Sequence, residues 1–299
     1  MKSNPIATQI SYQIKRQFKI KTYERLNLIV SFVIAPALAL LSAIIFRSDI
    51  DLVQNIAYPN FLFFMLISGV FFGLVTSVFE IIKDRLMVQR ERIGGVSVFS
   101  YYISKYYVLG VFGLIQSILY NLIGMFFLKI PIVLFVFNSF IMFMVVMVSI
   151  AFGLFVSSLT RSVLIASNMI PILIVPQILL GGLIPYENMD KLIYMWSNDY
   201  TNPPPITKII PVRYAYESII TGNVTFTIGE NEINDQISQM VDYLQDNQFM
   251  SIEKDNYLSF IKLHIFHMTW FYDIFVIVFF IILSFIVGYI IFFRRIYNG

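Results

Sequence analysis

The longest stretch of the chain without a charged residue, positions 130–160, reads IPIVLFVFNSFIMFMVVMVSIAFGLFVSSLT. Its 31 residues are apolar almost throughout, and apolar and polar positions do not alternate. A helix needs about 20 apolar residues to cross the hydrocarbon layer of a bilayer. The stretch therefore predicts a membrane-spanning helix and excludes a transmembrane strand, in which the two kinds of residue would alternate.

Five further charge-free stretches lie on either side of it. They occupy residues 26–46, 52–79, 106–128, 162–186 and 274–293. Over the 299 residues, 58% are hydrophobic and only 13% are charged, about half the charged share of a typical soluble domain. The composition thus excludes an ordinary soluble protein. We expect an all-α integral membrane protein with six transmembrane helices.

The charges between these stretches predict the side of the membrane on which each connection lies. Cytoplasmic connections are rich in Lys and Arg. Of the 21 such residues, 14 fall within 1–25, 83–105, 158–162 and 294–299. We therefore expect both termini in the cytoplasm and divide the chain into four parts. These are a cytoplasmic connecting helix (1–25), five spans with a cytoplasmic loop at 83–105 (26–186), an extracytoplasmic domain (187–270), and a sixth span with a cytoplasmic end (271–299).

The first 25 residues have the pattern of an amphipathic helix. Asn4-Pro5 is a typical helix start, with Asn as the cap and Pro at the first helical position. Apolar residues then recur every four positions, and basic residues face elsewhere: Ile6, Ile10, Ile14 and Phe18 against Lys15, Arg16 and Lys19. Such a helix is expected to lie on the inner leaflet. The alternative is an ordinary helix packed on protein.

The segment before the last span differs from the rest. Residues 187–272 contain 11 acidic and 5 basic residues. Within 229–247, apolar residues mark one face of a further amphipathic helix. We expect a small outer domain between spans 5 and 6.

The chain lacks the motifs of most enzyme classes. It has no phosphate-binding loop, no nucleophile-elbow or zincin motif, and no cysteine. His264 and His267 are three positions apart and would share one face of a helix. Two histidines are too few ligands for a typical zinc site, so no metal site is expected. The spans carry essentially no deeply placed ionisable residue, which argues against a proton-coupled carrier. No nucleic-acid partner is expected, and the span composition favours an amphipathic, lipid-like or peptide substrate.

Three short motifs appear in register with this topology. The first combines Glu80 at the end of span 2 with RERIGGVS at 90–97 and YYISK at 101–105. The second is GGLI at 181–184, and the third is PVRYAYE at 211–217. Together they resemble the membrane domain of type 2 ABC exporters, especially the G subfamily, over nearly the whole chain. The outer-domain cysteines of eukaryotic members are missing, which favours a bacterial protein of the cytoplasmic (inner) membrane.

The resemblance implies a permease half that dimerises with an identical or different half, each docked on an ABC ATPase. It places ATP and Mg²⁺ on that ATPase and no cofactor in this chain. The residues that it implies in coupling to the ATPase are Glu80, Arg90, Glu91, Arg92 and Gly95. The ones implied in lining the substrate cavity are Phe64, Val70 and Phe72 on span 2, and Val175, Ile178 and Leu179 on span 5. Leu183 and Ile184 would form the outer gate, and Arg213, Tyr214 and Glu217 would stabilise the outer domain.

Two other functions remain open from the residues alone. One is a membrane-bound transferase whose site lies in segment 187–272. The other is a non-transporting membrane scaffold whose outer domain binds a partner. The motif at 80–105 favours the exporter, because that loop is the only sizeable connection expected on the cytoplasmic side between the spans.

Overall fold

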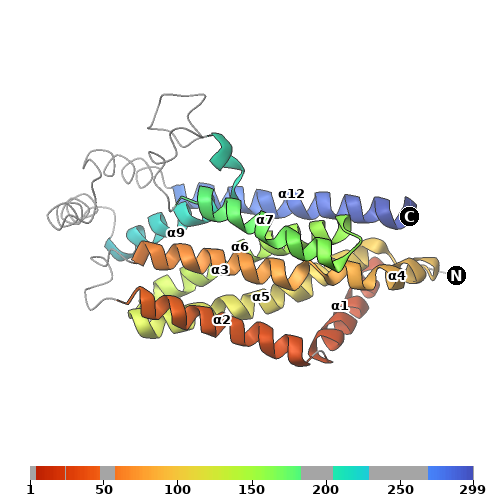
Figure 1. Cartoon of the computed structure of the whole chain (residues 1–299), viewed down its shortest axis with the longest axis horizontal. Helices are drawn as coiled ribbons and strands as arrows, with labels where there is room; N and C mark the ends of the chain where they lie inside the picture. The colour runs from red at the N-terminus through yellow and green to blue at the C-terminus, as the bar shows by residue number, and fades with distance from the viewer. Residues whose placement is uncertain (1–4, 24, 48–57, 183–204, 229–268, 299) are drawn as a thin grey trace.

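The computed structural model describes residues 5–23, 25–47, 58–182, 205–228 and 269–298, and every element in these ranges is helical. The elements are α1 (Ile6–Tyr23), α2 (Arg25–Ile45), α3 (Tyr58–Ser77), α4 (Glu80–Ile93), α5 (Val98–Leu128), α6 (Ile132–Leu159), α7 (Val163–Leu180), the 3₁₀ helix η4 (Pro205–Ile209), α9 (Pro211–Ile228) and α12 (Thr269–Asn298). Figure 1 shows them as one elongated bundle, with both ends of the chain at the same end of it.

Five helices of the described chain are long and apolar enough to cross a membrane. They are Tyr58–Ile93, Val98–Leu128, Ile132–Leu159, Val163–Leu180 and Trp270–Tyr297. The part of α2 from Phe32 to Ile45 is also apolar, but it is shorter than these five helices. The protein is therefore a multi-pass membrane protein, as the composition predicted.

The segment 83–105, expected as the cytoplasmic connection between spans 2 and 3, is a helical hairpin. α4 continues from α3 after a two-residue interruption, and α5 begins at Val98. The turn between them lies at Gly94-Gly95, where Gly95 has a φ of 89°, a conformation that favours glycine. Helices α3 and α4 together span 36 residues, or about 54 Å, which exceeds the roughly 30 Å apolar layer. The end of α4 and the start of α5 therefore project beyond it.

Small residues bring α3 and α6 into close contact. A Cβ atom at Gly73 would lie 2.5 Å from the Cβ of Ser149, and one at Gly153 would collide with the hydroxyl of Ser77. Small residues four positions apart allow such close approach of helices in membranes. One turn further along, the Ser157 hydroxyl accepts hydrogen bonds from the main-chain N–H groups of Ile81 and Ile82, at 3.0 and 3.2 Å. This contact therefore fixes where α4 begins.

The helix expected at the N-terminus is present as α1, and its polar side faces the bundle. Gln13 and Gln17 are buried, whereas Ile6 is exposed. Lys15 and Lys19 are also exposed. The glutamines and Arg16 face protein, so α1 combines the two alternatives that the sequence left open: it packs on the bundle and keeps exposed apolar and basic residues on its other sides.

α9 lies against the bundle, in contact with α3, α6 and α12. Its first turn is hydrogen-bonded to α7, since the Val212 N–H donates to the Gln177 side-chain oxygen at 3.3 Å. Near its other end, Asn223 closes a ring of hydrogen bonds with Tyr58 and Asn138, at 2.7 to 3.2 Å. Tyr58 begins α3, so α9 runs from partway along the bundle to its end. Most of the rest of the expected outer domain, 187–204 and 229–268, lies outside the described residues.

We predict that Gly153→Ala destabilises the protein, because its new methyl group would collide with Ser77. Overpacking of this kind costs about 1–3 kcal/mol. The melting temperature in detergent should fall, and adding Ser77→Ala should restore part of it by removing the hydroxyl. Gly69→Ala is the control, because its nearest neighbour is the flexible Met142 side chain at 3.3 Å. Equal melting temperatures for Gly153→Ala and Gly69→Ala would contradict the close contact.

Candidate functional site

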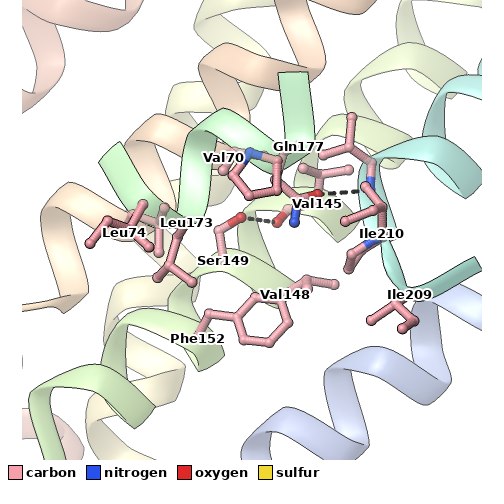
Figure 2. Close-up of a pocket in the computed structure, with 14 residues that line it drawn as sticks. Val70, Leu74, Val145, Val148, Ser149, Phe152, Leu173, Gln177, Ile209 and Ile210 are labelled. Atoms are coloured by element: carbon pink, nitrogen blue, oxygen red, sulfur yellow. Dashed lines mark hydrogen bonds between the residues drawn. The ribbon is translucent and has the colours of Figure 1, made fainter. Parts of the chain in front are cut away.

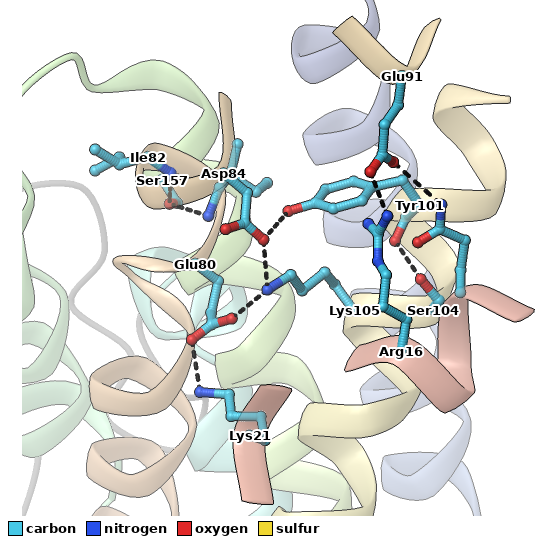
Figure 3. Close-up of polar contacts among 12 residues, drawn as sticks. Arg16, Lys21, Glu80, Ile82, Asp84, Glu91, Tyr101, Ser104, Lys105 and Ser157 are labelled. Carbon is cyan, nitrogen blue, oxygen red and sulfur yellow. Dashed lines mark hydrogen bonds and ion pairs between the residues drawn. The ribbon is translucent and has the colours of Figure 1, made fainter. Parts of the chain in front are cut away.

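Polar and charged contacts between distant segments concentrate at one end of the bundle, which we call the basic end. It comprises α1, α4, the first turns of α5, the turn between α6 and α7, and the last turns of α12. Figure 3 shows the central part of this network. Because five segments far apart in the sequence meet here, the basic end is the strongest candidate for a functional site in the described chain.

A buried ionic cluster lies at its centre. Glu80, at the start of α4, pairs with Lys21 of α1 and Lys105 of α5, each at 2.6 Å. Lys105 also pairs with Asp84 at 2.8 Å, and Tyr101 donates a hydrogen bond to Asp84 at 2.9 Å. Glu80 and Lys105 are only 5% and 4% exposed. Each of the two buried charges thus has two partners of opposite sign.

This arrangement links three helices through two buried charges, Glu80 and Lys105, and their partly exposed partners Lys21 and Asp84. Removing one partner of a buried ion pair leaves the other charged and unpaired, which typically costs about 3–5 kcal/mol. The cluster therefore holds α1, α4 and α5 in one relative position. The sequence placed Glu80 at the end of a span, and the structure supplies the partners that let its carboxylate be buried there.

Glu91 and Arg92, expected to face an ATPase, make contacts within this chain. The Glu91 carboxylate pairs with Arg16 of α1 and accepts a hydrogen bond from Gln13 at 3.2 Å. Arg92 donates to the main-chain oxygen of Ile296 at 2.6 Å and lies 3.6 Å from the ring centre of Tyr297. The two side chains therefore tie α4 to the first and last helices.

Four residues of α4 face outward. Lys83, Leu86, Arg90 and Ile93 are exposed, and their spacing of three, four and three places them on one side of the helix. We call them the α4 ridge. Leu86 is 71% and Ile93 is 88% exposed, although both are large apolar side chains. Of the coupling residues expected from sequence, Arg90 lies on this ridge, and Gly95 lies in the turn beyond it.

Arginines connect the turn between α6 and α7 to the same end. Arg85 of α4 donates to the main-chain oxygens of Thr160 and Ser158, at 2.7 and 3.4 Å. Arg295 of α12 donates to the oxygens of Ser158, at 2.6 Å, and of Leu159. The carbonyl groups at the end of α6 are thus paired, and α4 and α12 are both held to this turn.

The residues expected to line a substrate cavity do not face one space within this chain. Phe72 is buried and packs against Tyr120 of α5, with ring centres 6.5 Å apart. Val70 is also buried and lines a cavity between α3, α6, α7 and the start of α9 (Figure 2). The other four are exposed: Phe64, Val175, Ile178 and Leu179. The expected gate residues, Leu183 and Ile184, lie outside the described residues.

The motif at 211–217 forms the start of α9. Arg213 is buried and donates to the Thr207 hydroxyl at 3.0 Å and to Glu217 at 3.5 Å. Tyr214 donates to the main-chain oxygen of Lys208 at 3.1 Å. These contacts fold η4 onto α9.

Sequence reasoning missed the partners that give the basic end its structure. From the sequence, Arg16 was assigned only to the basic side of the first helix and Lys105 only to the motif at 101–105, while Lys21 and Asp84 were given no role. Glu80 and Lys105 are 25 positions apart, so helical spacing cannot pair them. The available signal was that charges of opposite sign flank the same membrane boundary on consecutive helices.

The described residues offer little for metal or catalytic chemistry. They contain no group of three or more His, Cys, Asp or Glu side chains that could hold a metal ion. His264 and His267 lie outside these residues.

We predict that Lys105→Met strongly destabilises the protein, because Glu80 would keep only Lys21 and Asp84 would lose its lysine. The expected loss is about 3–5 kcal/mol, measured as a lower melting temperature and a lower folded yield in detergent. Lys83→Met is the matched control, since Lys83 is exposed on α4. If both variants melt at the same temperature, the buried cluster does not contribute to stability.

Comparison with known families gives one match. The sequence profile of the family described as ABC-2 type transporter matches residues 8–222, more than two thirds of the chain. A search of individual curated proteins gave no match. The matched range extends from α1 into α9, and thus includes the ionic cluster and the α4 ridge.

Proposed function

The chain belongs to the ABC-2 type transporter family, and on this premise we propose that it is the permease subunit or domain of an ATP-driven exporter. Proteins of this family are the membrane component of ABC transporters. The proposed substrate is amphipathic, either lipid-like or a peptide. ATP and Mg²⁺ would bind on a separate or fused ATPase, which docks at the basic end. The observation that carries the proposal is the α4 ridge, held in place by contacts with four other segments.

The proposed topology places the basic end in the cytoplasm of a bacterial cell. It has six spans, of which α2 is the first and the five long apolar helices are the others. α2 has 21 residues, or about 31 Å of helix, enough for the apolar layer. Both described chain ends lie at the basic end, as an even number of spans requires (Figure 1). The concentration of Lys and Arg in these segments supports a cytoplasmic location.

The α4 ridge has the composition of a docking surface. Its two large apolar side chains alternate with two basic ones along the helix, and exposed apolar residues next to polar ones typically mark interaction sites. The ridge stands at the projecting end of α3–α4, beyond the apolar layer. A groove on the ATPase that accepts Leu86 and Ile93 and supplies acidic groups for Lys83 and Arg90 would fit it.

The contacts behind the ridge would transmit a movement of the ATPase to the spans. α4 is tied to α1 by Glu91, to α5 by Asp84 and Glu80, and to the end of α12 by Arg92. Charge-assisted contacts of this kind are short and directional. A shift of α4 would therefore move these helices together rather than deform the ridge alone.

The second permease half is proposed to pack on the side of the bundle where α7 lies. Val175, Ile178 and Leu179 of α7 are exposed, as is Phe64 of α3. In a dimer these four would border the space between the halves, which is where the substrate would pass. Leu183 and Ile184 follow α7 in the chain, a position suited to an outer gate.

We predict that Leu86→Ser combined with Ile93→Ser weakens binding of the ATPase without lowering the melting temperature of the chain. Burying one such side chain contributes about 1.5–3 kcal/mol, so affinity should fall at least about tenfold. The measurement is a titration of the chain in nanodiscs with the ATPase that is co-encoded with it. Ile132→Ser, an exposed isoleucine at the opposite end of the bundle, is the control. Unchanged affinity in the double variant would remove the ridge as the docking site.

A second prediction concerns the pair that connects α4 to α1. Arg16→Gln and Glu91→Gln should each lower ATP hydrolysis by the complex in lipid vesicles several-fold, because a hydrogen bond to a charged group contributes about 1.5–3 kcal/mol. Combining them should lower it no further, since the two residues act as one unit. Lys15→Gln, next to Arg16 but exposed, should hydrolyse ATP at the wild-type rate. Additive losses in the double variant would show that the two residues act separately.

A further inference from the structure

A cavity of about 180 Å³ lies inside the single chain, between α3, α6, α7 and the start of α9 (Figure 2). Its wall is formed almost entirely by aliphatic side chains, including Val70 and Leu74 of α3, Val145 and Val148 of α6, and Leu173 of α7. The cavity is therefore formed by one chain alone. Its occupant has to be apolar.

The polar side chains in the wall do not call for a polar ligand. The Ser149 hydroxyl donates to the main-chain oxygen of Val145 at 2.8 Å, and the Gln177 side-chain oxygen accepts from Val212 at 3.3 Å (Figure 2). A buried water needs two to four polar partners. The Ser149 hydroxyl hydrogen and the Gln177 oxygen are thus already bonded within the chain, and the other side chains of the wall are apolar. The cavity therefore offers little to water, whereas an empty space would leave the lining without van der Waals contacts.

The cavity reaches the outside of the bundle beside α7. Ile172 of α7 and Ile209 of η4 line it, yet they are 59% and 68% exposed. The surface of α7 next to this opening is apolar, with Val175 and Leu179 exposed. In a multi-pass membrane protein, such a surface faces either lipid or another apolar partner. The opening therefore meets either membrane lipid or the proposed space between two permease halves, and both can supply hydrocarbon chains.

The volume limits what can enter. An apolar cavity of about 150 Å³ accommodates a benzene-sized molecule of six carbons. Pockets for whole drug-sized ligands are about 300–1,000 Å³. A cavity of about 180 Å³ therefore fits a segment of about six or seven carbons, which is the end of a chain rather than a complete amphiphile.

From the wall, the opening and the volume, we propose that this cavity binds the end of one alkyl chain, whose polar head stays outside the bundle. The site goes beyond the proposed transport function, because it belongs to the isolated chain and its occupancy needs neither ATP nor an ATPase. The chain could come from a bilayer phospholipid or from a single-chain amphiphile, and the chemistry recognised is the same.

The test uses photo-crosslinking of the purified chain in nanodiscs. One probe is a phosphatidylcholine and the other a fatty acid, each with a diazirine at the end of an acyl chain. Val145 and Val148 line the cavity and are only 2% exposed, so crosslinks to these two residues require a probe inside the cavity. We expect crosslinks there in the wild type. Their absence with both probes would overturn the proposal.

Cavity-filling variants provide the second arm. Val148→Phe should lower crosslinking at positions 145 and 148 at least about fivefold, because the phenyl ring occupies the space of the alkyl chain. Val136→Phe makes the same change on α6 at a position that is 60% exposed, and it should leave crosslinking at the wild-type level. If Val148→Phe impairs folding, Leu173→Phe fills the cavity from the half-buried face of α7. Wild-type crosslinking in folded filling variants would overturn the proposal.

The two probes identify the source of the chain. Labelling by the phospholipid alone assigns the site to bilayer lipid, and labelling by the fatty acid alone assigns it to single-chain amphiphiles. Labelling by both assigns it to alkyl chains in general. Each of these three results supports the site. The proposal is overturned if neither probe labels the cavity, or if the folded cavity-filling variants are labelled like the wild type.

Discussion

The close contact between α3 and α6 is the constraint on which the rest of the structure depends. Gly73 and Ser77 on one helix meet Ser149 and Gly153 on the other, at a separation that leaves no room for larger side chains. In a membrane, where apolar surfaces gain little by avoiding lipid, such fitted contacts are a main source of helix association. The contact ends at Ser157, whose hydroxyl pairs the first N–H groups of α4. The packing of two spans thereby determines where the projecting helix starts, and with it the place of Glu80.

The ionic cluster then gives that projecting helix a defined position. Lys21 and Lys105 hold Glu80 from two sides, while Arg16 holds the far end of α4 through Glu91. Burial of ion pairs seldom adds much net stability, because desolvation opposes the attraction. Their contribution here is positional: few other arrangements of α1, α4 and α5 would leave all these charges paired. A connection of this kind suits a protein whose proposed task is to carry a movement from one side to the other.

The sequence allowed the membrane helices to be predicted well, because each apolar run is long and bounded by charges. Where a helix continues through charged residues, the apolar pattern alone did not show its extent. Residues 83–93 contain Lys, Arg and Glu, which end an apolar run but are good helix formers, so the cytoplasmic connection expected at 83–105 contains a helix. The turn at Gly94-Gly95 was predictable, since Gly95 adopts a positive φ. That the side chains of Glu91 and Arg92 face inward could not be predicted, because their partners lie in α1 and α12, at the two ends of the chain. Val70 and Phe72 were expected in one cavity, but only two positions apart on a helix they face different neighbours.

The two-residue interruption between α3 and α4 has a geometrical consequence. At this point the hydroxyl of Ser157 replaces hydrogen bonds that a continuous helix would make along its own axis. A helix is stiff along its length, so bending concentrates where its internal bonds are missing. α4 extends about 21 Å beyond this joint, given its 14 residues. It is therefore a lever arm with a pivot at its base, and a rotation of roughly 10° would displace its tip by about 4 Å. Under the proposed function, a displacement of the tip of α4 by the ATPase would therefore produce a much smaller displacement at the base of α4, beside Gly153 and Ser157 of α6.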